Sequence, residues 1–123
     1  MSQPKSDAEV VDAYIRNYTE KDDSLFWGFL QVQDYVRSDP IHAWKVTLLL
    51  IEAAPTPEAL SYVAAGPLED LLYGRGEQFI DEVERLARRD PKFRRALLGV
   101  YNESESPGDV HDRVIKAAAG TSN

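Results

Sequence analysis

The residues best placed to do chemistry are two adjacent carboxylates, Glu69 and Asp70, in the stretch AAGPLEDLLYGRGE of residues 64–77. Paired acids beside a glycine-rich turn suggest a general acid and base, or a pair of ligands for a metal ion. On a helix, however, neighbouring residues point about 100° apart, so these carboxylates need partners from elsewhere in the chain to act on one atom. A metal-dependent hydrolase built on this pair is therefore the third of three hypotheses, behind two kinds of binding protein.

The same stretch has a structural explanation. Gly66 tolerates the backbone angles of a junction between two helices, and Pro67 favours the first turn of the second helix. Glu69 and Asp70 then lie in that first turn, where each carboxylate stabilises the positive end of the helix dipole by about 0.3–1 kcal/mol. Gly74 is placed as a left-handed C-terminal cap. We favour this interpretation, in which the short helix is buried through Leu68, Leu71 and Leu72.

Other catalytic and metal-binding patterns are missing from the sequence. Gly74-Arg75-Gly76 has neither the dinucleotide-binding spacing nor the Gly-Lys-Ser/Thr of a P-loop, and the Gly-x-Ser-x-Gly and His-Glu-x-x-His motifs are absent. The chain has no cysteine, and neither His42 nor His111 has a second histidine nearby, so we expect packing or surface roles for both. We predict no metal site, no cofactor, and binding rather than catalysis.

A basic stretch, RLARRDPKFRR at residues 85–95, is a candidate nucleic-acid interface. Asp81 with Arg85, and Glu84 with Arg88, instead have the i,i+4 spacing of ion pairs on a solvated helix face. We prefer the solvated face and keep a nucleic-acid-associated helical protein as the alternative function. Its candidate phosphate contacts are Arg88, Arg89, Lys92, Arg94 and Arg95.

Trp27 is the most informative single residue. At about 100° per residue it points away from the apolar arc of its helix and shares its side with Gln31 and Asp34. One interpretation buries Trp27 against a neighbouring helix, and the other exposes it as an anchor for a protein partner, since tryptophan is enriched in interface hot spots. The candidate partner-binding residues are Trp27, Gln31, Asp34, Asp22 and Asp23, with Asp12 and Glu20 as further acids around them.

The elements that must position these residues have the period of helices. A capping side chain followed by proline recurs at Asp39-Pro40, Thr56-Pro57, Asp90-Pro91 and Ser106-Pro107, and each pair favours a helix start. Ser6 with Glu9 has the spacing of a capping box, and Ser24 is a plain cap. We expect helices at about residues 7–20, 25–37, 40–53, 56–65, 67–73, 77–89, 91–101 and 108–118.

Length and composition agree with this pattern. We predict one all-α domain spanning residues 1–123, with 1–6 and 119–123 frayed, as about seven short helices in an antiparallel array that could resemble a short α-solenoid. The net charge of −7 suits a basic protein partner and disfavours nucleic acid and anionic membranes. The longest apolar run, residues 46–51, is far shorter than the ~20 residues of a membrane span. Without a signal-like start, we expect a cytoplasmic protein.

Residues 14–101 also resemble a known family, most closely through AAGPLEDLLYGRGEQFIDEVERLARRDPKFRRALLGVY. The resemblance is to small, mostly bacterial helical domains of unknown function. Their signature runs Gly-Pro-Leu-Glu-Asp-Leu-Leu, then Gly, then Ala-Arg-x-Asp-Pro-x-Phe-Arg. Histidine often precedes the glycine in that family and tryptophan often lies near the end, where this chain has Arg75 and Tyr101. The resemblance implies a helical fold and brings no activity with it.

Size, acidity and the helical pattern together favour a non-enzymatic protein-binding module. The most concrete form of this hypothesis is a small acidic immunity-type protein that neutralises a bacterial toxin. The sequence does not indicate an oligomeric state.

Overall fold

The computed structural model describes residues 5–100 and 108–120, which are helical and contain no strand. The prediction of an all-α fold is confirmed, whereas the expected start at Ser106-Pro107 lies outside the described residues. A 3₁₀ turn, η1 (Asp23–Leu25), precedes α2, and a π-helical turn, η2 (Ala64–Leu68), joins α4 to α5. The α-helices are α1 (Asp7–Thr19), α2 (Phe26–Ser38), α3 (Pro40–Ala53), α4 (Pro57–Val63), α5 (Glu69–Arg89), α6 (Pro91–Leu97) and α7 (Gly108–Ala118).

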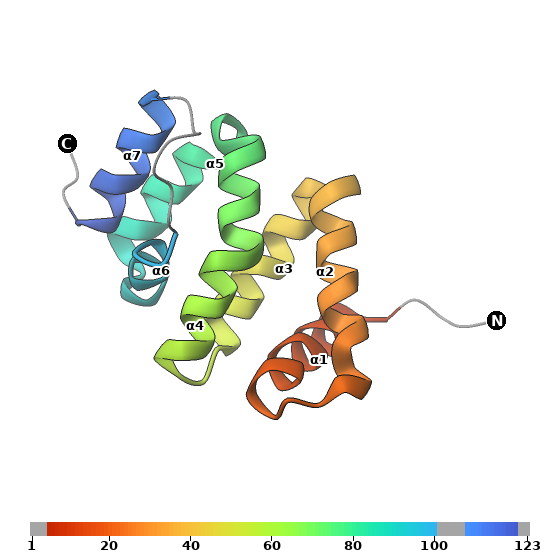
Figure 1. Cartoon of the computed structure of the whole chain (residues 1–123). Coiled ribbons are helices and arrows are strands. Elements are labelled where there is room, and N and C mark those ends of the chain that lie inside the picture. Colours follow the sequence, from red (N-terminus) through yellow and green to blue (C-terminus); the bar gives the residue numbers. More distant parts are fainter. Residues whose placement is uncertain (1–4, 101–107, 121–123) are drawn as a thin grey trace.

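The helices form an array in which neighbours in the chain pack together. Figure 1 shows α1 and α2 at one end of the molecule and α6 and α7 at the other, with α3 and α5 between them. Along one side of the array, α4, η2 and the first part of α5 follow one another. This order brings α2 close to η2 and α1 close to α4, although α3 separates α1 and α2 from α4 and η2 in sequence.

Most helix starts use the predicted caps. Ser6 and Glu9 form a reciprocal capping box at the start of α1, with hydrogen bonds of 3.0 and 3.1 Å. Asp39, Thr56 and Asp90 each accept a backbone N–H of the following helix, and the proline after each is the first helical residue. The prediction was wrong for Ser24, which does not cap α2. Asp22 does the capping there, by accepting hydrogen bonds from the backbone N–H and the hydroxyl of Ser24 at η1.

The core runs through the centre of α3. Trp44 stacks on Phe79 of α5, with ring centroids 4.7 Å apart, and meets the edge of Phe93 of α6 at 6.3 Å. The one polar residue buried in the described core, Thr47, donates its hydroxyl to the Ala43 carbonyl of the preceding turn. α3 is therefore the central packed helix of the described structure. Although α3 is so apolar, neither it nor any other described helix has the length and hydrophobicity needed to cross a bilayer.

The region from Gly66 to Gly76 has the two breaks in the helix that the sequence predicts, but the second break lies at a different residue. Gly66 has non-helical angles at the junction of α4 with α5, as expected. A second break was expected at Gly74, but the non-helical residue is Arg75, with φ −138° and ψ 29°. Gly74 is not in the left-handed region and does not cap a helix. Two expected helices, 67–73 and 77–89, are therefore halves of a bent α5, and Figure 1 shows α5 turning back toward α7.

Candidate functional site

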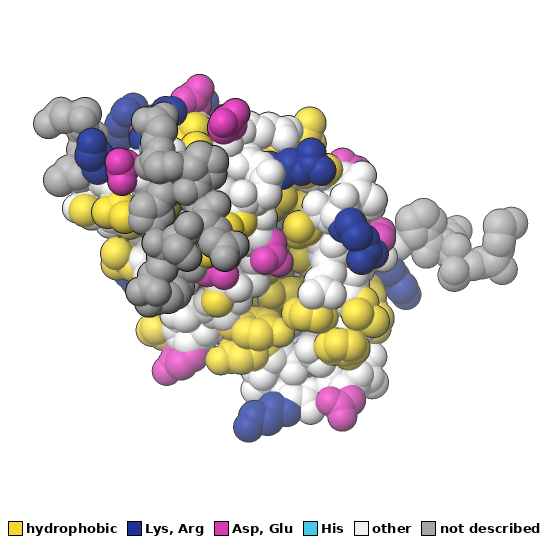
Figure 2. Space-filling model, turned by 45° about the horizontal axis from the view of Figure 1, so that its top comes forward, with side chains coloured by type: hydrophobic (Ala, Val, Ile, Leu, Met, Phe, Trp, Pro, Cys, Tyr) yellow, Lys and Arg dark blue, Asp and Glu magenta, His cyan; other side chains and the backbone are white. Residues whose placement is uncertain are grey.

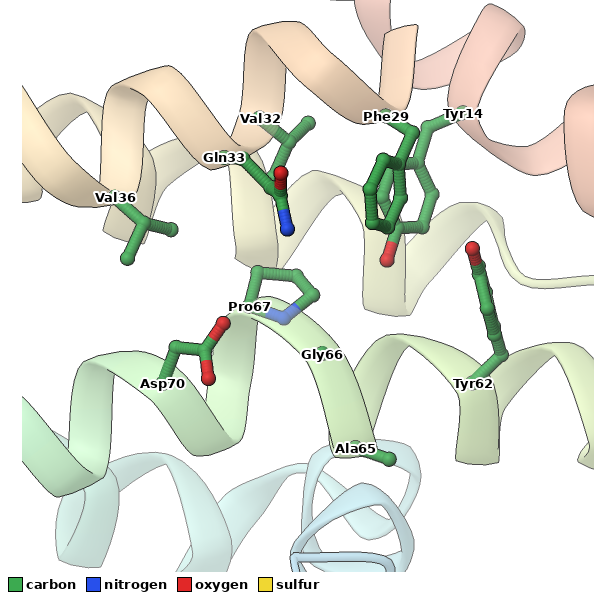
Figure 3. A pocket seen from close by; sticks show the side chains of 10 residues that line it. All are labelled: Tyr14, Phe29, Val32, Gln33, Val36, Tyr62, Ala65, Gly66, Pro67 and Asp70. Carbon is green, nitrogen blue, oxygen red and sulfur yellow. The ribbon is translucent and has the colours of Figure 1, made fainter. Parts of the chain in front are cut away.

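A pocket of about 280 Å³ opens between α1 and α2 on one side and α4, η2 and α5 on the other. Figure 3 shows Tyr14, Phe29 and Tyr62 around one part of the pocket, and Gln33 and Asp70 extending from opposite walls around the other. We call this site the aromatic pocket. Its remaining lining residues are Val32, Val36, Ala65, Gly66 and Pro67.

The aromatic rings of this pocket continue onto the molecular surface. Tyr14 lies 6.0 Å from Phe29 and 5.4 Å from Tyr62, measured between ring centroids. Outside the pocket, Tyr18 stacks on Tyr62 at 4.1 Å, and Phe26 stacks on Phe29 at 5.2 Å. A connected run of rings therefore leads from the exposed ends of α1 and α2 into the pocket.

The hydroxyl group of Tyr14 is an unusual feature of the pocket. Tyr14 is 1% exposed, and its buried hydroxyl group has the Tyr62 hydroxyl as a polar neighbour but makes no hydrogen bond of good geometry within the described structure. A Cβ atom added at Gly66 would lie 3.0 Å from that oxygen, so the hydroxyl packs closely against the glycine and a larger residue there would crowd it. Burial raises the pKa of Tyr14, and Tyr62 and Asp70 add to this effect. A buried polar group of this kind is costly unless a ligand or water satisfies it.

Asp70 and Glu69, the predicted acidic pair, have different surroundings. Both lie in the first turn of α5, as predicted, above the buried Leu71. Asp70 lines the aromatic pocket and Glu69 does not, so the two carboxylates do not share one site. Although Asp70 lies on an exposed side of α5, desolvation of its carboxyl group raises its pKa. Of the predicted pair, the structure brings only Asp70 to a pocket with other polar groups.

The predicted docking residues on α2 lie on a different flank from the aromatic pocket. Trp27 is half-buried and packs against the core, and the Nζ of Lys5 lies 5.4 Å from the centroid of its ring. Gln31 is also half-buried, whereas Asp34 is exposed and pairs with Arg37 at 3.2 Å. Trp27 therefore combines the two interpretations of the sequence, because it is partly packed and partly open to solvent.

The acids at the start of α2 also have local roles. Asp22 accepts two hydrogen bonds from Ser24, which lower the pKa of its carboxyl group. Asp23 is exposed in the first turn of η1. Asp12 and Glu20 lie 3.3 and 3.0 Å from the guanidinium of Arg16 on α1. The acids that were predicted to surround Trp27 are thus partly engaged in contacts within the chain.

Two cations of the basic stretch 85–95 stabilise helix ends. Lys92 donates from Nζ to the carbonyl oxygens of Glu52 and Ala54, at 2.8 and 2.9 Å, where α3 ends. Arg94 donates to the carbonyl oxygen of Ala87 near the end of α5, at 2.6 Å. These carbonyls are the unsatisfied acceptors of helix C-termini. The other candidate phosphate contacts, Arg88, Arg89 and Arg95, are exposed.

The ion pairs of α5 differ from the predicted ones. Arg85 pairs with Glu82 at 3.7 Å, three residues away, rather than with Asp81. Asp81 and Glu84 both bind Arg113 of α7, at 2.7 and 2.6 Å. The i,i+4 prediction was wrong because it considered one helix alone, whereas α7 packs against this face of α5.

His42 has the packing role expected of it. It lies against the ring of Tyr35, with centroids 4.2 Å apart, and its Nε2 is 2.8 Å from Oδ1 of Asp7. The side chain of His111 lies outside the described part of the structure. Within residues 5–100 and 108–120, no three His, Asp or Glu side chains come together in a way that could hold a metal ion.

A second, wider depression of about 520 Å³ lies between α1 and α3. Its lining is mostly aliphatic, with Asp12 and Glu52 as its acids. It has no aromatic side chain, and the described structure gives it no buried unsatisfied polar atom. The aromatic pocket is therefore the stronger candidate for specific binding. The apolar residues of the second depression are Ala8, Val11, Ile15, Leu49 and Ala53.

Sequence reasoning found Asp70 and Gly66 but missed Tyr14, Phe29 and Tyr62. The apolar period of their helices places Tyr14 and Phe29 on core-facing sides, and both do pack in or against the core. Their helical period shows that they face inward, but it does not show that α1, α2 and α4 leave a space there. The only local signal was Gly66, a residue without a side chain opposite a tyrosine hydroxyl.

The chain was compared with protein families, curated proteins and solved structures, and the match is to a family. No curated protein and no solved structure matches the chain. The Gly-Pro-Leu-Glu-Asp-Leu-Leu signature and the bacterial character of the expected family remain predictions. Residues 16–122 match the family of unknown function DUF6869, and the chain belongs to this family.

Proposed function

We propose that the chain is a non-enzymatic protein-binding module for a partner with a basic surface. Its most concrete form is a small acidic immunity-type protein that neutralises a bacterial toxin. The observation that carries this proposal is the exposed apolar face around the aromatic pocket.

That face combines exposed and half-buried side chains. Leu30 is 52% exposed, Phe26 46% and Tyr18 37%. Phe26 stacks on the half-buried Phe29 and Tyr18 on the half-buried Tyr62, and Leu30 follows Phe26 by one turn of α2. Figure 2 shows hydrophobic side chains gathered in the lower centre of the molecule, on the side where α1, α2 and α4 lie in Figure 1. Contiguous apolar surface of this kind marks interaction sites, and aromatic residues are enriched at the centres of protein interfaces. We define Tyr18, Phe26, Phe29, Leu30 and Tyr62 as the aromatic face.

Charge supports a basic partner. The chain carries a net charge of −7, and the acids Glu20, Asp22 and Asp23 lie in sequence between Tyr18 and Phe26. Negative charge around an apolar patch accelerates association with a positive partner and disfavours acidic ones.

The pocket itself supports binding rather than catalysis. Asp70 lines it together with the amide of Gln33 and the hydroxyls of Tyr14 and Tyr62. Glu69 lies outside this set. Acid–base or metal-dependent hydrolysis uses several convergent groups around one reacting atom, and the separation of the two carboxylates removes that arrangement. The basic stretch gives the nucleic-acid alternative less support, since Lys92 and Arg94 are engaged at helix ends.

The test is to identify a partner by chemical cross-linking in the source cell and then to measure its binding in purified form. Leu30→Ser should weaken that binding by about tenfold or more if the aromatic face is the centre of the interface. Ile115→Ser is the matched control, because Ile115 is 53% exposed on α7, at the other end of the array. Equal effects of the two substitutions, or a partner with an acidic surface, would contradict the proposal.

The flank of α2 that carries Trp27, Gln31 and Asp34 is the docking surface predicted from the sequence, and it is the alternative to the aromatic face. Trp27→Ala should then speed dissociation and cost ~2 kcal/mol or more of binding free energy, whereas removal of nearby acids should mainly slow association at low salt. Binding kinetics of Trp27→Ala and Leu30→Ser distinguish the two surfaces. Because Trp27 packs against the core, thermal unfolding of the variant must be measured alongside.

A further inference from the structure

We propose that the aromatic pocket binds a cationic side chain, the ammonium of a lysine or the guanidinium of an arginine. This inference rests on the proposed function only for the source of that side chain, which is the basic partner. The site and its chemistry are argued from the pocket alone.

The walls of the pocket suit the stem and the head of such a side chain. The aliphatic stem of lysine or arginine packs on apolar surface while the charged head reaches polar groups. Val36, Pro67 and Phe29 supply apolar surface to this pocket, and Asp70 and the Tyr62 hydroxyl supply the polar groups. Figure 3 shows the hydroxyl groups of Tyr14 and Tyr62 directed toward the space that these residues enclose.

The volume also fits one side chain. Pockets for cofactors and drug-sized ligands usually enclose about 300–1,000 Å³. The aromatic pocket, at about 280 Å³, lies just below that range. A dinucleotide or a similarly large cofactor would not fit, whereas a single long side chain would.

The polar groups decide between a cation and other ligands. The hydroxyl oxygen of Tyr62, which is half-buried at the wall of the pocket, can accept a hydrogen bond from an N–H donor. Asp70 places a carboxylate at the same pocket. An anion would be repelled by that carboxylate, and a neutral apolar group would desolvate it without compensation. A positively charged donor satisfies both the carboxylate and the hydroxyl.

Gly66 leaves room for the Tyr14 hydroxyl at the wall of the pocket. Because an added Cβ would come within 3.0 Å of the Tyr14 oxygen, any side chain at position 66 would occupy the space beside that hydroxyl. The glycine therefore has a second use besides allowing the junction between α4 and α5.

The test uses small probes and no partner protein. We expect n-butylammonium and n-butylguanidinium to shift the NMR signals of Tyr14, Tyr62 and Asp70 in a saturable way. The neutral 1-butanol and the anionic butyrate should bind at least about tenfold more weakly, since each lacks the charge-assisted hydrogen bond to the carboxylate. Equal binding of butanol and butylammonium, or shifts at the depression between α1 and α3 instead, would overturn the proposal.

Two variants assign the effect to named groups. Asp70→Asn should weaken n-butylammonium binding about tenfold. Its control is Asp112→Asn, which makes the same charge change at an exposed position on α7, outside the pocket. Tyr62→Phe tests the pocket independently if Asp70→Asn alters the fold, and it should weaken binding through loss of an acceptor. An Asp70→Asn protein that folds normally and binds the probe as the wild type does would show that the pocket is not a cation site.

Failure of this inference and failure of the proposed function give different results. A partner whose binding responds to Leu30→Ser but not to Asp70→Asn or Tyr62→Phe would support a protein-binding module and reject the cation pocket. Saturable binding of butylammonium, together with a failure to find any protein partner, would support the cation pocket and reject the protein-binding module.

Discussion

Arg113 on α7 binds Glu84 on α5 through two nitrogens of its guanidinium, with Nε at 2.8 Å and Nη2 at 2.6 Å from the carboxylate oxygens. Nη2 also donates to Asp81, at 2.7 Å. The hydrogen bonds from Arg113 lower the pKa of Glu84, and the same carboxylate raises the pKa of Arg113. The planar fork of arginine matches a carboxylate in this geometry, so the contact fixes the orientation of α7 as well as its attachment.

Arg113→Met should loosen α7 while keeping the aliphatic part of the side chain. Because the substitution removes the ion pairs that join α7 to Asp81 and Glu84 of α5, we expect faster amide hydrogen exchange in residues 108–118 and little change in α1 to α3. Arg85→Met is the control, since Arg85 pairs with Glu82 within α5. If both variants exchange alike in α7, the Arg113 contact does not hold this helix.

Two glycines in helices should respond in opposite ways to alanine. A Cβ at Gly28 would lie 2.7 Å from both the Cβ of Ala13 and the backbone nitrogen of Tyr14, so α1 and α2 approach closely at this point. Gly28→Ala should therefore lower the free energy of unfolding by about 1–3 kcal/mol through overpacking. Gly74 has no atom within 4 Å of an added Cβ, so Gly74→Ala should stabilise α5 by about 0.5–1 kcal/mol.

Urea denaturation of these two variants measures the difference. Stabilisation by Gly28→Ala would mean that the α1–α2 contact relaxes easily. A loss of stability in Gly74→Ala would support the left-handed cap that the sequence suggested and the structure contradicts.

Substitutions at Leu71 and Glu69 test two different contributions to stability, core packing at Leu71 and the interaction of a carboxylate with the helix dipole at Glu69. Leu71 is fully buried, so Leu71→Ala should cost about 2–5 kcal/mol of stability by leaving a cavity. Glu69→Gln should cost no more than about 1 kcal/mol if its carboxylate acts mainly on the dipole of α5. Chemical denaturation of both variants tests this order, and a larger loss for Glu69→Gln would assign that residue a role beyond the helix start.

Asp7 should make the stability of the protein depend on pH. A hydrogen bond from His42 is the main cause of the lowered pKa of Asp7, and Lys45, whose Nζ is 3.5 Å away, contributes. Because the pKa is lower in the folded state, the carboxylate stabilises the fold above its ordinary pKa, and this contribution is lost as the pH falls through the lowered value. The stability difference between the wild type and Asp7→Asn should therefore be largest near neutral pH and vanish in acid.

A double-mutant cycle with His42→Phe identifies the cause of this pH dependence. The phenylalanine keeps an aromatic ring beside Tyr35 but cannot bond Asp7. In the His42→Phe background, Asp7→Asn should cost less stability than it does alone. If Asp7→Asn costs the same stability in both backgrounds, the lowered pKa of Asp7 is due to Lys45 rather than to His42.

The positions of the helices were predictable from the sequence because their signals are local. Asp39, Thr56 and Asp90 bond backbone groups two or three residues away, and the proline after each starts the helix wherever the rest of the chain lies. Even here, the choice between Ser24 and Asp22 as a cap depended on a turn geometry that residue types alone do not specify.

The candidate site was decided by tertiary structure. Tyr14 and Tyr62 belong to helices far apart in the chain, and nothing in the spacing of either helix shows that their rings come within 5.4 Å of each other. The same holds for Arg113, whose partner Glu84 was predicted to bond within its own helix. A helical period tells which side of a helix is buried, but the helix that covers it depends on how all the helices pack together. Whether the packing is complete or leaves a pocket depends on side-chain volumes from several helices at once, and this is why Asp70 could be recognised as a helix-start acid but not as part of the aromatic pocket.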